Sequence, residues 1–208
     1  MKYRPDKHHR RSIRLSGYDY SQNGAYFITV CATNKEFIFG DIENGEMRLN
    51  DAGRIVMEEW MKTADIRPGV ELDACVVMPN HFHGIIVVSN DRGTAIGRGT
   101  ARRAPTVERF GQPVSGSIPT VMRSFKSAVT KRINEMHQTP GKPLWQRNYY
   151  EHVIRNENEL NRIRQYIIDN PAKWETDHEN PDAANGRDMA NCRGTANCRG
   201  TARRASTV

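Results

Sequence analysis

The chain has 208 residues, of which 37% are hydrophobic and 26% charged, and its formal net charge is +7. This length suits one packed core with appendages, and no apolar run approaches the ~18 residues of a membrane span, so we expect no membrane partner. Lys and Arg outnumber Asp and Glu six to one over 1–14 and nine to one over 92–132. Such concentrated positive charge favours a nucleic-acid partner, although chance clustering on a solvated surface gives the same pattern.

The first half of the chain contains several predicted strands and one helix. Residues 1–20 are polar and basic and predict an extended arm, whereas 25–33 is rich in β-branched and aromatic residues and predicts a strand. The segments 37–40 and 46–49, on either side of an Asn-Gly pair, predict a short hairpin. Asn50 or Asp51 can cap a following helix, whose apolar positions Ile55, Val56 and Trp60 fit a helical period.

Two strands are predicted at 70–78 and 81–88, and the second begins with two histidines. Because side chains alternate along a strand, His81 and His83 should project from one face while Phe82 enters the core on the other. The two imidazoles could bind a divalent cation, but two ligands do not make a metal site. Paired strand histidines are also common as surface or hydrogen-bonded residues.

Two segments look like appendages to the fold. Residues 89–117 are rich in Gly, Arg and Pro and predict a flexible insert, and the segment 98–107 recurs almost unchanged at 199–208. We therefore predict a folded domain over 21–178 that carries this insert, followed by a disordered tail over 179–208. The role of the repeated segments stays open.

The second half of the chain contains two predicted helices. Residues 118–136 form an amphipathic pattern with a basic face, and Asn156 with Glu159 forms a capping box that opens a helix ending at Asn170 and Pro171. Tyr166 and Asn170 lie one turn apart on a single face of that helix. If this face packs near the histidines, Asn170 can supply a third metal ligand and Tyr166 a nucleophile. By default, however, Tyr166 would be a core residue and Asn170 a C-cap.

The cysteines indicate in which cellular compartment the protein is expected to work. Cys31 and Cys75 sit inside apolar runs, and the chain has no Cys-x-x-Cys pair. Buried, unpaired cysteines are typical of a reducing cytoplasm, which is the location we expect.

Three motifs, in this order, resemble the IS200-like single-tyrosine transposases, and more narrowly the branch associated with repetitive extragenic palindromes (REPs). The motifs are Pro-Asn-His-Phe-His at 79–83, Trp-Gln-Arg-Asn-Tyr-Tyr-Glu-His-Val-Ile-Arg at 145–155, and Tyr-Ile-Ile-Asp-Asn-Pro at 166–171. The resemblance extends from about residue 8 to about residue 178. It implies an α+β fold, namely a ferredoxin-like or RRM-like antiparallel sheet with packed helices.

The resemblance also implies a site and a reaction. His81 and His83 would hold Mg²⁺ or Mn²⁺, with Asn170 as third ligand, and Tyr166 would attack the scissile phosphate. The products would be a 5′-phosphotyrosine and a free 3′-hydroxyl on single-stranded DNA beside a hairpin. Such an enzyme would act in the cytoplasm of a prokaryotic cell, at the nucleoid, as a monomer or a homodimer.

Several alternatives remain open at the level of sequence. Tyr149 and Tyr150 are adjacent competing nucleophiles, although Tyr166 matches the motif better. A non-catalytic nucleic-acid-binding module of the same fold, or a metal hydrolase that uses activated water, would carry the same histidines. The basic residues predicted to contact DNA phosphates are Arg10, Arg11, Arg123, Lys126 and Arg147.

Overall fold

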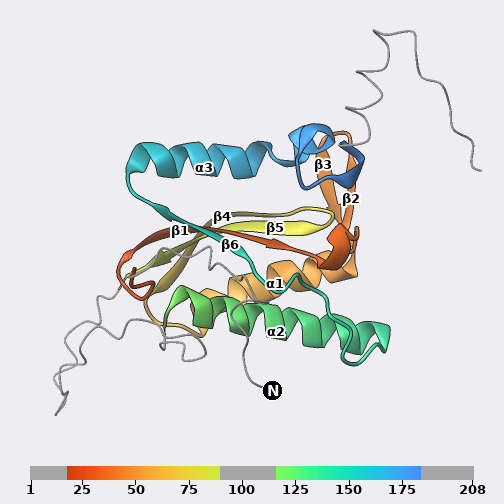
Figure 1. Cartoon of the computed structure of the whole chain (residues 1–208), viewed down its shortest axis with the longest axis horizontal. Coiled ribbons are helices and arrows are strands. Elements are labelled where there is room, and N and C mark those ends of the chain that lie inside the picture. Colours follow the sequence, from red (N-terminus) through yellow and green to blue (C-terminus); the bar gives the residue numbers. More distant parts are fainter. Residues whose placement is uncertain (1–17, 90–115, 184–208) are drawn as a thin grey trace, which may run out of the picture.

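The computed structural model describes residues 18–89 and 116–183, which form a four-stranded antiparallel sheet with helices on both faces (Figure 1). The sheet has the order β4-β5-β1-β6. Its strands are β1 (Gly24–Cys31), β4 (Val70–Val77), β5 (His81–Val88) and β6 (Tyr150–Ile154). With a helix between β1 and β4 and another between β5 and β6, this is the βαββαβ arrangement of ferredoxin-like folds, as predicted. None of the helices in these residues is long and apolar enough to cross a membrane.

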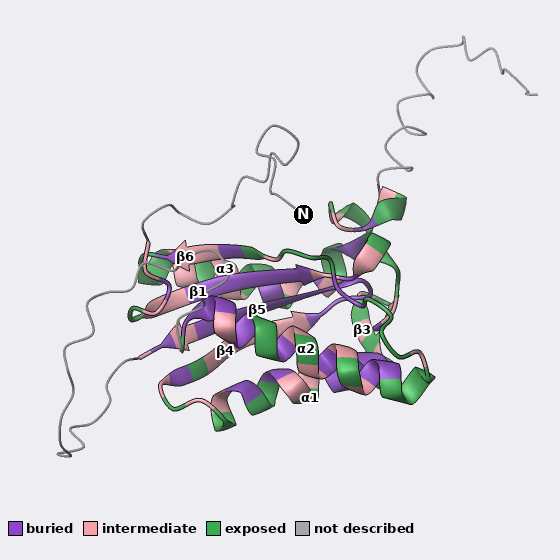
Figure 2. Ribbon diagram, turned by 60° about the horizontal axis from the view of Figure 1, so that its bottom comes forward, coloured by how far each residue is buried: buried purple, intermediate pink, exposed green. Residues whose placement is uncertain are grey.

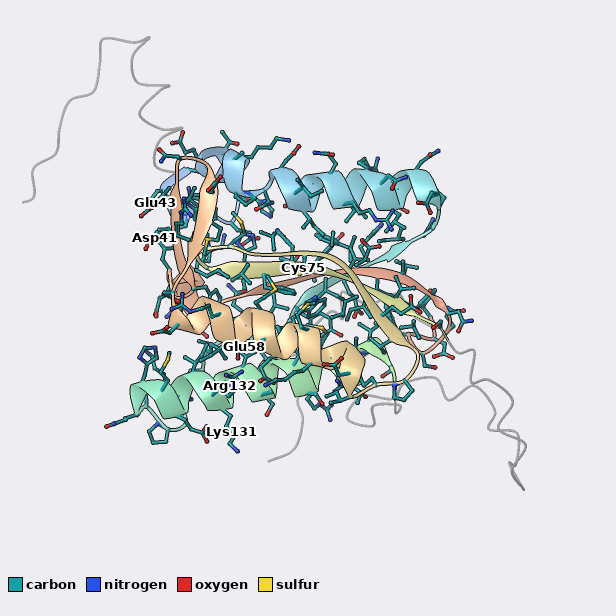
Figure 3. The ribbon with its side chains drawn as sticks, turned by 180° about the vertical axis from the view of Figure 1, so that it is seen from behind. Asp41, Glu43, Glu58, Cys75, Lys131 and Arg132 are labelled. Atoms are coloured by element: carbon teal, nitrogen blue, oxygen red, sulfur yellow. The ribbon has the colours of Figure 1, made fainter. Side chains whose placement is uncertain are left out.

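Helices α1 (Asp51–Asp65) and α2 (Ile118–His137) cover one face of the sheet. Asn50 caps α1 by accepting a hydrogen bond from the backbone N–H of Gly53 at 3.0 Å. Arg132 of α2 ties the two helices together through ion pairs with Glu58 and Glu59 of α1, at 2.7 and 2.8 Å (Figure 3). The main core lies between these helices and the sheet, and Figure 2 shows its burial along β1 and β5.

Helix α3 (Glu157–Asp169) covers the opposite face. A second, smaller core forms there from Phe27, Ile85, Ile154 and Ile167. Asn156 caps the helix by accepting from the N–H of Glu159 at 2.9 Å, which confirms the predicted start. The Glu159 carboxylate accepts instead from the N–H of Arg155 at 2.8 Å, one residue before the position that a capping box requires.

A short hairpin, β2 (Gly40–Glu43) and β3 (Glu46–Leu49), stands at one end of the sheet. Its turn residues Asn44 and Gly45 have φ of 54° and 77°, as the Asn-Gly pair predicts. The first strand begins at Gly40, three residues later than expected. The reason is that Phe39 is fully buried against Trp145, with ring centroids 5.0 Å apart, and its N–H donates to the carbonyl of Pro79.

The sequence left 144–154 without an assigned element, and the structure places the edge strand β6 there. The ordered fold also exceeds the predicted limits of 21 and 178. Tyr20 is buried in the main core, and Asn180, beyond the 3₁₀ segment Pro171–Thr176, is buried as well. Most of the predicted insert and tail, at 90–115 and 184–208, and residues 1–17 of the arm lie outside the described residues.

Candidate active site

The two histidines lie at the start of β5, a central strand of the sheet. Pairing with β4 on one side and β1 on the other fixes the face of the sheet from which each histidine projects. His81 and His83 are 0% and 2% exposed and face α3. Phe82 points to the other face and packs on Trp60 of α1, with ring centroids 4.6 Å apart. The side chains therefore alternate as predicted: Phe82 enters the main core, and the two imidazoles lie together on the face of the sheet that α3 covers.

The tautomer of His81 is set by its neighbour Asn80. The Nδ1 atom of His81 lies 2.8 Å from Asn80 Oδ1. An amide oxygen only accepts, so Nδ1 of His81 donates and Nε2 of the neutral ring keeps a lone pair. That lone pair faces His83, because the two Nε2 atoms are 3.0 Å apart.

His83 is oriented by Thr29 of β1, the residue directly opposite it in the sheet. Thr29 Oγ1 lies 2.8 Å from Nδ1 of His83. When Thr29 accepts from this nitrogen, His83 also presents an Nε2 lone pair, and the two lone pairs converge on one point. Such an arrangement is unfavourable for two neutral imidazoles alone and favourable around a cation.

Both imidazoles are held neutral. Burial lowers the pKa of His81 well below its usual range, and the adjacent His83 lowers it further. Burial likewise lowers the pKa of His83 to about 3, with the charge of His178 as a smaller cause. Neutral imidazole is the form that binds metal ions, so these environments keep the pair ready as ligands at neutral pH.

Helix α3 brings Tyr166 to this pair, and Asn170 forms the C-terminal cap of the same helix. Tyr166 Oη lies 3.3 Å from Nε2 of His83, and the tyrosine is 39% exposed, so the phenol contacts His83 while part of the side chain reaches solvent. Burial raises the pKa of Tyr166 above its ordinary value, as does the charge of Asp177, while a hydrogen bond from the Asn170 side chain opposes this shift. The phenol is thus protonated at neutral pH and would need a nearby positive charge to become a nucleophile.

Asn170 has a feature that suits a metal ligand. Its side chain is 2% exposed, and Oδ1 is buried with no hydrogen-bond partner within residues 18–89 and 116–183. A buried amide oxygen without a partner is costly unless another group satisfies it. In the described parts of the chain, no three or more His, Cys, Asp and Glu side chains gather to hold a metal ion. The donor set of two imidazole nitrogens and one amide oxygen fits a divalent cation.

We compared the chain with known proteins at the level of both sequence and structure. No family model matches it. An uncharacterized protein of Haemophilus influenzae is 42% identical over 176 residues, covering 85% of this chain and 96% of that one. The chain belongs to the family of that protein.

The structural comparison decides the fold. A REP-associated tyrosine transposase, solved bound to a REP hairpin, matches with a TM-score of 0.51 and 21% identity, over 95% of this chain and 96% of that one. The chain has the fold of the REP-associated tyrosine transposases. A candidate transposase from Deinococcus radiodurans R1 also matches, with a TM-score of 0.37 and 19% identity over 76% of this chain and 96% of that one.

Within this transposase fold, the segment after α3 closes one side of the histidine pair. Asn80 donates from Nδ2 to the carbonyl of Glu179 at 2.8 Å, and Trp174 lies near His81 with ring centroids 6.0 Å apart. The Glu179 carboxylate pairs with Lys35 at 3.2 Å. The same Asn80 side chain therefore orients His81 and anchors this segment. Glu179, at the start of the predicted disordered tail, therefore packs beside the histidine pair through its contact with Asn80.

Sequence reasoning missed Thr29 and Asn80 as partners of the histidines. Asn80 is part of the Pro-Asn-His-Phe-His motif, and its residue type next to His81 could have suggested a role in orienting that ring. Thr29 carried no such signal, because it is 54 residues from His83 in sequence. Only the pairing of β1 with β5 brings them together.

The basic residues predicted to bind DNA differ in how exposed they are and in what they contact. Arg123 of α2 and Arg147 are exposed, whereas Arg10 and Arg11 lie outside the described residues. Lys126 donates from Nζ to the carbonyls of Gln146, at 2.6 Å, and of Arg147 and Asn148, at 3.4 Å each. Burial lowers the pKa of Lys126 to about 8. Because its ammonium group already binds the carbonyls of the loop 146–148, Lys126 has a structural role. The predicted contact of Lys126 with DNA stays a prediction.

Proposed function

We propose that this chain is a metal-dependent transposase that nicks and rejoins single-stranded DNA through a covalent link to Tyr166. The observation that carries the proposal is the position of Tyr166 Oη, 3.3 Å from Nε2 of His83, beside two histidine nitrogens that converge. A solvent-accessible phenol next to a candidate cation site is the arrangement that tyrosine nucleophiles require. The shared fold with a REP-associated tyrosine transposase supports the same reaction class.

The proposed step exchanges one phosphodiester for another. Tyr166 Oη loses its proton to water and bonds to the scissile phosphorus, and the bond from that phosphorus to the 3′ oxygen breaks. The 3′ oxygen takes up a proton and leaves as a free hydroxyl, while the 5′ side stays attached to Tyr166. A 3′-hydroxyl of a second strand can reverse the step and release the protein, so no nucleotide cofactor is needed.

The proposed metal is Mg²⁺ or Mn²⁺, held by His81, His83 and Asn170. When bound, it supplies positive charge that polarises the scissile phosphate and lowers the pKa of a nearby phenol. The residues fit because the two Nε2 atoms lie 3.0 Å apart and Asn170 Oδ1 is buried without a partner in the described residues. Thr29 and Asn80 would orient the two imidazoles.

The proposed DNA partner is a hairpin with a single-stranded flank. The structural neighbour is bound to a REP hairpin, and the net charge of +7 on this chain suits a phosphate backbone. A protein that processes such DNA in a prokaryote would work in the cytoplasm.

A non-catalytic binding module is the second candidate. Nucleic-acid binders of the RRM type stack bases on an open sheet face. Here α1 and α2 cover one face and α3 covers much of the other, so neither face offers a platform that is open across the whole sheet (Figure 1). This packing favours the enzyme over the binding module.

The decisive experiment is capture of a covalent protein–DNA adduct. Wild-type protein is incubated with hairpins bearing single-stranded flanks and with Mn²⁺ or Mg²⁺, and adducts are resolved on denaturing gels. We expect adducts with wild type and with Tyr150→Phe, and none with Tyr166→Phe. Adducts that persist in Tyr166→Phe would refute the assigned nucleophile. Binding without any adduct would favour the module, and cleavage without an adduct would favour a metal hydrolase that uses activated water.

A further inference from the structure

Tyr150 is an exposed aromatic residue on the same face as the histidines. It opens the edge strand β6, and 52% of its surface is exposed. It pairs with Thr29 of β1, which in turn pairs with His83 of β5. Residues directly opposite one another on antiparallel strands project from the same face, so Tyr150, Thr29 and His83 form one row across the sheet.

Phe27 connects Tyr150 to the candidate nucleophile. The Phe27 ring stacks on His83, with centroids 5.3 Å apart and planes 27° apart. It also meets Tyr166 and Tyr150 edge-on, with centroid distances of 6.0 and 6.4 Å. Phe27 itself is buried, so Tyr150 and Tyr166 are the rings of this cluster that a ligand can reach.

We propose that Tyr150 stacks on an unpaired base adjacent to the phosphate that Tyr166 attacks. This inference rests on the proposed function, and it names the substrate feature that the site reads: an unstacked base at the cleavage position. Because the Phe27 ring contacts both Tyr166 and Tyr150, a base that neighbours a phosphate at Tyr166 can reach the ring of Tyr150. Base–aromatic stacking tolerates any sequence, because every base has a π face, and a base within a duplex has no free face to offer.

Stacking explains the exposure of Tyr150 better than a chemical role does. Tyr166, not Tyr150, has the hydrogen bond to the histidine pair, at 3.3 Å. The contact of Phe27 with Tyr150 is edge-on, so it supports the ring from the side. A phenylalanine at this position would keep the stacking ring and lose the hydroxyl, which separates the two roles.

The test uses the full chain and a hairpin with a single-stranded flank, in which 2-aminopurine replaces the base next to the cleavage position found with wild type. We expect its fluorescence to be quenched on binding to wild type and to Tyr150→Phe, but not to Tyr150→Ala. We also expect Tyr150→Ala to weaken binding of the flanked hairpin by about tenfold or more, and to leave binding of a flankless hairpin unchanged. Ile168→Ala is the matched control, because Ile168 is an exposed apolar residue of α3.

The outcomes separate this inference from the function on which it rests. Equal quenching and equal affinity in wild type and Tyr150→Ala would overturn the stacking role while adduct formation by wild type upholds the function. Loss of adducts in Tyr150→Phe would make the hydroxyl essential and would also overturn it. Absence of both binding and adducts in wild type would refute the proposed function itself. If Tyr150→Ala does not fold, Tyr150→Thr gives a ringless side chain that suits a strand, and quenching in wild type remains an independent readout.

Discussion

Asp73 of β4 and Arg164 of α3 form a bidentate ion pair, with Nε and Nη2 of the arginine 3.0 and 2.6 Å from the two carboxylate oxygens. Asp73 sits where the register of β4 against β5 shifts, between Leu72 and Cys75. At this irregularity the Asp73 carboxylate points toward α3, the helix that carries Arg164 and, two residues later, Tyr166. The pair therefore fixes α3, and with it the phenol, relative to the strand that holds the histidines.

We predict that Arg164→Lys lowers adduct formation by about tenfold or more, because a lysine cannot make the bidentate contact and small displacements of a reacting group are costly. Arg162→Lys is the control on the same helix, since the Arg162 side chain is 78% exposed. The exchanged pair, Asp73→Arg with Arg164→Asp, should recover part of the activity. Equal adduct yields from Arg164→Lys and wild type would contradict this role.

The same pair predicts a pH dependence of stability. Hydrogen bonds from Arg164 lower the pKa of Asp73 below its ordinary 3.8. The folded protein therefore binds this proton less readily than the unfolded chain. The stabilisation is complete above the unfolded pKa and is lost as the pH falls through the lower folded pKa. Urea unfolding should show Asp73→Asn less stable than wild type at neutral pH, with the difference shrinking below about pH 4. A difference independent of pH would contradict the prediction.

Thr29→Val should weaken Mn²⁺ binding by about ten- to a hundredfold while leaving the fold intact, because it removes the hydroxyl that orients His83 and keeps the shape of the side chain. Titration calorimetry measures the affinity, and circular dichroism checks the fold. Thr29→Ser keeps the hydroxyl and should bind Mn²⁺ nearly as well as wild type. Unchanged affinity in Thr29→Val would show that His83 needs no such partner.

Lys126 gives a prediction at alkaline pH. Burial lowers its pKa to about 8 in the folded protein. Between about pH 8 and its ordinary pKa of 10.5 the unfolded chain binds the proton and the folded chain does not, so stability due to this residue rises with pH across that window. Wild type should gain stability relative to Lys126→Met over this range in urea unfolding. Arg123→Ala, an exposed change on the same helix, should show no such trend and should instead weaken DNA binding.

Local patterns were enough to predict much of this structure. The alternation around His81 and His83 placed both imidazoles on one face, and the Asn156 cap predicted a helix that carries Tyr166, with Asn170 one turn later at its C-terminal cap. Each of these rests on a few neighbouring residues, whose spacing the sequence shows directly.

Features that depend on contacts between distant segments could not be predicted. The pairing of Thr29 with His83 and Tyr150 depends on strand register. The strand β6 has only five residues and includes a buried Glu151, so its pattern is weak. The charge of Lys126 suggested an exposed phosphate contact, because the loop carbonyls that hold it come from residues 20 to 22 positions away.

The almost complete burial of His81 and His83 has a kinetic consequence. Because both rings are almost fully buried and Tyr166 of α3 contacts His83, we expect a cation to reach the two Nε2 atoms only when α3 moves, so that movement would control how fast metal enters and leaves. We expect a chelator such as EDTA to strip bound Mn²⁺ slowly, at a rate that does not rise with chelator concentration. Single-stranded DNA lying against Tyr166 should slow the loss further. A stripping rate proportional to EDTA concentration would show instead that the ion is openly accessible.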